Sequence, residues 1–266
     1  MNVGITGLCT PAAWTLGETL SKIREAGYVS YELALRDEGW FSLTSSDIQL
    51  REVAREAAAA GVDLVSLCPA FKSRPKDLIT ADAVVRRESL KTVEECLRIA
   101  SVTGVKTVLL TLGALTPELY YDAAYANGLD SMRRLAPVAE RFGVRLAIEY
   151  VWNKFLLSPM EFNAFLDAVG SSHVGFYFDP GNMAVFGYPE HWVRLCRRHV
   201  MAVHMKDFRR QGWQWTPLLS GDVCFPAVMR ELRAAGFDGP LVSEVDGSIA
   251  PLNETAKAIR EIMGMG

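Results

Sequence analysis

The sequence predicts a single (β/α)8 barrel that spans residues 1–266. Two observations predict this fold. Short β-rich apolar runs alternate eight times with longer segments of helical period, and no linker or low-complexity tract interrupts the alternation. A third observation argues against an open doubly wound sheet, because Gly4 and Gly7 form no GxGxxG turn and the chain has no GxxxxGK[ST] loop.

The expected elements follow one another in a regular order. Strands are predicted at Val3–Gly7, Val29–Leu35, Val62–Cys68, Thr107–Leu112, Arg145–Trp152, Val174–Asp179, Met201–Lys206 and Leu241–Asp246. Helices are predicted at about 15–26, 45–60, 80–103, 128–142, 158–169, 189–198, 224–235 and 254–263. Glycines that favour a left-handed helix end stand just after six helical segments, namely Gly27, Gly61, Gly104, Gly143, Gly170 and Gly236.

The two faces of the predicted strands differ in character. In the fifth strand, Leu146 and Ile148 share one face, while Ala147 and Glu149 share the other. The same division into a bulky apolar face and a small or polar face recurs in the second, sixth and seventh strands. The small or polar face should point into the barrel and end at the C-terminal rim, where barrels of this kind place their active sites.

Composition bounds the class of protein. Half of the residues are hydrophobic, 22% are charged and the net charge is −3, so we expect neither a disordered chain nor a nucleic-acid or polybasic membrane binder. The opening Met1–Gly17 is too polar for a signal peptide or membrane span, and the five cysteines form no CxxC pair. We therefore expect a cytoplasmic protein. A mean hydropathy of +0.11, together with aromatic loop residues, favours a homodimer.

Four ionisable residues lie near the ends of strands five to eight: Glu149, Asp179, His204 and Glu244. Neighbouring strands are about 4.8 Å apart, so the four side chains can converge on one point. Three carboxylates there would repel one another, and a divalent cation removes that repulsion. Oxygen ligands plus one imidazole suit Mn²⁺, Mg²⁺, Co²⁺ or Zn²⁺. Taken singly, each of the four residues could instead form an ordinary ion pair.

The chain resembles the sugar-phosphate isomerases and epimerases of the xylose isomerase-like TIM barrel, in the AP endonuclease 2 superfamily. The motifs that carry the resemblance are Ala147–Glu149, Phe178–Asn182, Val203–Asp207, Gly221–Phe225 and Phe237–Glu244. The resemblance implies one divalent metal, most often manganese, held by residues that match the four above. It also implies that Glu149 and Glu244 act as acid and base on a small sugar or sugar phosphate.

This chain departs from the pattern of the free-ketose 3-epimerases at two places. Asn182 stands where they carry a histidine, and Val151–Phe155 lacks their second glutamate. Asn182 is closer to the L-xylulose-5-phosphate 3-epimerase branch. The departures therefore favour a phosphorylated or carboxylated sugar.

Four further side chains are candidate substrate contacts: Glu32, Asn182, Lys206 and Arg209. Glu32 could accept from a sugar hydroxyl or form a structural pair. Lys206 could polarise a substrate oxygen or pair with Asp179 or Asp246. Arg209 follows strand seven, in a region where many barrels bind phosphate, although loop cations are more often simply solvated.

The sequence leaves several functions open. The leading one is a metal-dependent isomerase or epimerase of a ketose or its phosphate, which removes a carbon-bound proton next to a carbonyl. An inosose- or dehydroshikimate-type dehydratase would begin with the same proton abstraction and then expel a hydroxyl. An endonuclease IV-like nuclease would need more histidines than the four present, and a mere binding protein would be expected to lose one of the four ligands.

Overall fold

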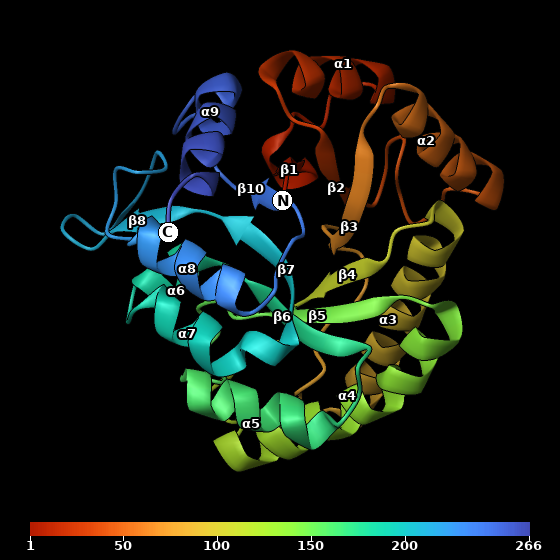
Figure 1. The fold of residues 1–266 in the computed structure, drawn as a ribbon. Helices are drawn as coiled ribbons and strands as arrows, with labels where there is room; N and C mark the ends of the chain where they lie inside the picture. The colour runs from red at the N-terminus through yellow and green to blue at the C-terminus, as the bar shows by residue number, and fades with distance from the viewer.

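The computed structural model describes residues 1–266 and shows a closed barrel of eight parallel strands inside a ring of helices (Figure 1). The barrel order is β1-β10-β7-β6-β5-β4-β3-β2. Its strands are β1 Val3–Thr6, β2 Ser30–Leu35, β3 Asp63–Pro69, β4 Thr107–Leu110, β5 Arg145–Glu149, β6 Val174–Phe178, β7 Val200–Met205 and β10 Leu241–Ser243. The eight predicted strands and the predicted fold are confirmed.

The helices cover the outside of the barrel. They are α1 Leu16–Ala26, α2 Asp47–Ala59, α3 Ala83–Thr103, α4 Tyr121–Phe142, α5 Pro159–Val169, α6 Pro180–Ala184, α7 Pro189–Cys196, α8 Phe225–Ala234 and α9 Leu252–Met263. All six of the predicted helix-ending glycines have positive φ angles. None of the helices combines the length and the apolar character that a membrane crossing requires.

Helix α4 begins at Tyr121, earlier than the predicted residue 128. Asn127 and Gly128 look like weak helix formers, but both make contacts outside the helix. The Asn127 amide donates to the carbonyls of Ile79 and Thr80 at 3.1 Å. A Cβ at position 128 would lie 3.2 Å from the Ile79 side chain, so glycine allows close packing there.

Three short elements were not predicted from the sequence. Strands β8 Asp207–Arg209 and β9 Gln214–Thr216 form an antiparallel hairpin directly after β7. Asp207 anchors this region, because its carboxylate accepts from the backbone N–H groups of Phe208, Gly221 and Val223 at 2.8–3.2 Å. Helix α6 begins just after Asp179, whose side chain caps it by accepting from the Asn182 N–H at 3.0 Å.

The strand faces are arranged as their alternation predicts. Leu146, Ile148 and Phe176 belong to the large core between strands and helices, whereas Ala147 and Tyr177 belong to a small separate cluster with Cys68 and Leu109. Above this inner apolar layer, the inward positions are polar. The barrel therefore directs ionisable side chains toward its C-terminal end.

Candidate metal and acid–base site

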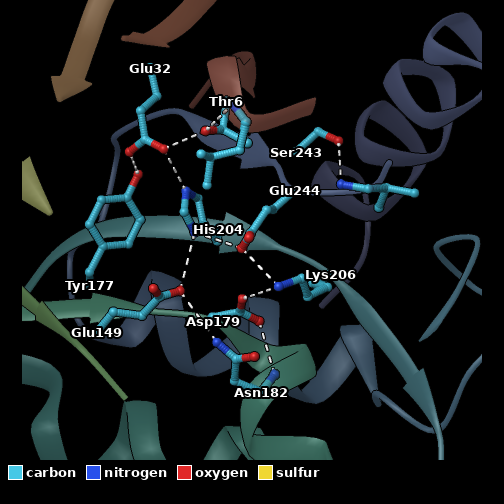
Figure 2. A network of polar contacts seen from close by, with 12 residues as sticks. Thr6, Glu32, Glu149, Tyr177, Asp179, Asn182, His204, Lys206, Ser243 and Glu244 are labelled. Carbon is cyan, nitrogen blue, oxygen red and sulfur yellow. Dashed lines mark hydrogen bonds and ion pairs between the residues drawn. The ribbon is translucent and has the colours of Figure 1, made fainter. Parts of the chain in front are cut away.

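The four predicted ligands come together at the C-terminal end of the barrel (Figure 2). One ligand atom from each of Glu149, Asp179, His204 and Glu244 lies within 4.8 Å of the other three. Glu149 ends β5, Asp179 follows β6, His204 lies in β7 and Glu244 follows β10. Adjacent parallel strands end at the same rim, which is why residues up to 95 positions apart in sequence meet here (149 to 244).

His204 stands at the centre of the cluster, with Glu32 on one side and the catalytic candidates on the other (Figure 2). Its Nε2 lies 3.1 Å from Glu32 Oε1. Its Nδ1 lies 3.3 Å from Glu149 Oε1 and 3.2 Å from Glu244 Oε2. When Nε2–H donates to Glu32, the Nδ1 lone pair points at the carboxylates, which is the tautomer that a metal ligand needs.

Glu32 lies beneath the site, whereas the sequence placed it at the rim as a possible sugar-hydroxyl acceptor. It is fully buried, and Thr6, Ser66 and Tyr177 donate to its two oxygens at 2.6–2.8 Å. Burial by itself raises the pKa of Glu32, but His204 and these hydroxyl donors hold that pKa below its usual value. With the His204 contact its two oxygens have four partners, so Glu32 orients the histidine.

Lys206 occupies the opposite side of the cluster. Its Nζ lies 2.9 Å from Glu244 Oε2 and 3.6 Å from Asp179 Oδ2, and 4.5 Å from the centre of the Trp215 ring. Burial alone lowers the pKa of this lysine, but Asp179 and Glu244 raise it above the ordinary value. Lys206 is therefore a cation in direct contact with two predicted metal ligands. Of the two roles that the sequence offered for Lys206, the structure shows the pairing with Asp179.

Asn182 positions Glu149. Its side-chain nitrogen donates to Glu149 Oε1 at 3.3 Å and to the Tyr150 carbonyl at 3.2 Å. The Trp152 indole in turn donates to the Asn182 carbonyl at 3.1 Å, and its ring stacks on Trp215 at 5.1 Å. Aromatic rings thus cover one side of the cluster, next to Lys206.

Arg209 lies in β8, outside this cluster. Its guanidinium donates to the Ser220 carbonyl, and the neighbouring Arg210 pairs with Asp222 at 3.3 Å. Both arginines therefore hold the hairpin to the loop that precedes α8.

The two glutamates experience different electrostatic surroundings. Burial raises the pKa of Glu149 to about 7. Burial would also raise the pKa of Glu244, but the cations His204 and Lys206 lower it to about 2. For His204, burial opposes the charge, yet Tyr177 and the carboxylates of Glu32 and Glu244 raise its pKa well above the usual value.

The donor set fits a divalent cation. Asp179 Oδ2 is buried and has no hydrogen-bond partner, and Lys206 Nζ lies 3.6 Å from it. Buried carboxylate oxygens without donors are rare, because leaving them unpaired is costly. Three carboxylates and one imidazole nitrogen would satisfy the coordination preferences of Mn²⁺, Mg²⁺, Co²⁺ or Zn²⁺.

Sequence reasoning missed the partners of Glu32 and the role of Asp207. Tyr177 shares the inward strand face with Gly175, and this alternation is a signal that could have found it. Ser66 and Thr6 carry no comparable signal, because small hydroxyl residues occur in strands throughout the chain.

Comparison with known proteins agrees with this architecture. Residues 20–263 match the family described as the xylose isomerase-like TIM barrel. The chain belongs to this family.

Among curated members, the chain is 23% identical over 261 residues to the L-ribulose-5-phosphate 3-epimerase UlaE of Salmonella heidelberg (strain SL476), covering 96% of this chain and 92% of that one. Among solved structures, a D-tagatose 3-epimerase-like protein superposes with a TM-score of 0.83 at 17% identity, over 99% of this chain and 97% of that one. A D-psicose 3-epimerase gives a TM-score of 0.81 at 18% identity, over 99% and 100%. The structural likeness establishes the shared fold.

Proposed function

We propose that this family member is a divalent-metal-dependent isomerase or epimerase of a ketose or sugar phosphate. The observation that carries the proposal is the convergence on one point of two carboxylates from different strands of the barrel. Glu149 from β5 and Glu244 after β10 both lie within 3.3 Å of the same His204 nitrogen. A substrate carbon bound beside this point would have two carboxylates within reach, one to remove a proton and one to return it, which epimerisation requires.

The bound metal would supply positive charge that stabilises the enediolate formed next to the substrate carbonyl. Glu149, Asp179, His204 and Glu244 would hold it. Of these, Glu149 and Glu244 also transfer the proton. Their unequal surroundings support this role, because Glu149 contacts the neutral amide of Asn182 whereas Glu244 contacts the ammonium of Lys206.

The surrounding residues would divide the remaining work. Lys206 reaches the same opening as Glu244, so its ammonium would donate to a substrate oxygen. Asn182 would hold Glu149 in its working orientation, and Glu32 would hold His204. The distant relationship to an L-ribulose-5-phosphate 3-epimerase supports a sugar-phosphate substrate.

The test is turnover in deuterated water with added Mn²⁺, using ketopentoses, ketohexoses and their phosphates. Deuterium at the carbon next to the carbonyl, without another change in mass, is the expected result, because the captured proton exchanges with solvent before its return. Loss of water from the substrate would assign a dehydratase instead. Absence of exchange on every sugar would refute the proposal.

Variants test the two glutamates. Glu149→Gln and Glu244→Gln should each reduce turnover at least about 10²-fold, the lower end for general acid–base catalysis. Glu94→Gln, an exposed position on α3, is the matched control and should retain full turnover. Metal content must be measured in each variant, since both glutamates are also proposed ligands.

A further inference from the structure

A groove leads away from the metal site over the ends of β10, β1 and β2. Its inner part is a cavity of about 250 Å³ whose lining includes Glu244 and Lys206. Its outer part, of about 520 Å³, shares the wall residues Leu8, Cys9 and Asp246 with the inner part. The two cavities therefore adjoin, and a ligand that occupied both would extend from Glu244 into the outer cavity.

Arg36 is the only basic side chain that lines the outer cavity. It directly follows β2 and is half-buried. One of its terminal nitrogens donates to the Gly7 carbonyl at 2.7 Å, which holds the guanidinium in place. The Arg36 guanidinium forms no ion pair with a carboxylate. A guanidinium that is held in place but lacks an anionic partner can offer its remaining donors to a phosphate or carboxylate.

The carboxylate on the same wall, that of Asp246, is engaged within its own loop through one oxygen. Asp246 Oδ1 accepts from the backbone N–H of Ser248 at 2.9 Å and from its hydroxyl at 2.6 Å. Asp246 therefore stays within its own loop after β10. The arginines after β7 line neither of the two cavities, since Arg209 donates to the Ser220 carbonyl and Arg210 pairs with Asp222.

We propose that Arg36 binds an anionic group, phosphate or carboxylate, at the end of the substrate remote from its reacting carbons. This inference rests on the proposed sugar isomerase or epimerase function and deepens it. It places the anion subsite beside β2, whereas the sequence pointed to the loop after β7. The metal site would then hold the carbonyl end, and Arg36 would select charged sugars over neutral ones.

The test compares equilibrium binding of a ketopentose 5-phosphate, the matching sugar acid and the unmodified ketopentose by calorimetry in the presence of Mn²⁺. The wild type should bind at least one anionic sugar at least about tenfold more tightly than the neutral one, since a charge-assisted hydrogen bond contributes about that factor or more. The anionic sugar that binds more tightly than the neutral one identifies phosphate or carboxylate as the group that Arg36 recognises.

Arg36→Gln should abolish that preference and leave binding of the neutral sugar unchanged. Arg36→Lys keeps the charge but not the fork of donors, so it should retain part of the preference. Arg197→Gln removes the same charge at the opposite end of the barrel, just before β7, and should behave as wild type. Circular dichroism checks that each variant is folded.

Equal binding of neutral and anionic sugars by the wild type, or no binding of any of them, would overturn the proposal, as would a preference that survives Arg36→Gln. Because the measurement needs no turnover, it is separate from the test of catalysis. An Arg36-dependent preference without solvent exchange would uphold the subsite and refute the isomerase or epimerase function.

Discussion

Replacing Glu32 by glutamine probes the layer beneath the proposed metal site without replacing any of the four candidate ligands. Glu32 accepts from Thr6, Ser66 and Tyr177 and faces His204 Nε2 at 3.1 Å. A glutamine has nearly the same shape, but its amide nitrogen cannot accept a hydrogen bond. Whichever way the amide is turned, two of the four contacts lose their acceptor.

The size of the effect follows from those two contacts. Hydrogen bonds to a charged group contribute about 1.5–3 kcal/mol each, so the free energy of unfolding should fall by about 3 kcal/mol or more. Loss of the carboxylate also weakens the control of the His204 tautomer. Changes of this kind reduce metal affinity by about 10- to 100-fold.

Denaturant unfolding of the metal-free protein and calorimetric titration with Mn²⁺ measure the two effects separately. Tyr177→Phe removes a single donor to Glu32 and should give a smaller change in both. Glu52→Gln breaks only an exposed pair with Arg55 and should change neither. An unchanged Mn²⁺ affinity in folded Glu32→Gln would refute the orienting role.

Three other predictions follow from the structure, and a fourth follows from the sequence alone. Saturation with Mn²⁺ at about 100 times its Kd should stabilise the wild type by about 2.7 kcal/mol and raise its Tm by about 5–10 °C in a thermal melt. The Tm of folded His204→Ala should not rise. Apparent Mn²⁺ affinity should increase from pH 6 to pH 8. The pKa of Glu149 is raised to about 7, so metal must displace a proton from this residue at the lower pH. Equal affinity at both pH values in calorimetry would contradict this prediction. Asp207→Ala should destabilise the protein by about 3 kcal/mol in denaturant unfolding, because three backbone N–H groups lose their acceptor, and Asp207→Asn should cost less because one oxygen remains. Light scattering should detect a homodimer, and a mass of 29.4 kDa would refute that expectation.

Local sequence rules determined the barrel and the convergence of its four candidate ligands. Strand alternation placed Glu149 and His204 on inward faces, and parallel strands end at a common rim, so these positions could be predicted without coordinates. The helix-ending glycines were also predictable, because a left-handed residue after a helix is a local backbone requirement.

Only the tertiary structure decided how the polar side chains pair. Glu32 was visible as an inward glutamate, but its partners Thr6, Ser66 and Tyr177 come from three other strands and meet it only when the barrel closes. The same holds for Arg36 and Arg209, which look equivalent as loop cations. Both guanidiniums donate to a backbone carbonyl, Arg36 to that of Gly7 and Arg209 to that of Ser220, but Arg36 also lines the outer cavity. That difference depends on which carbonyls and carboxylates the folded chain brings within hydrogen-bond reach, and sequence spacing does not encode it.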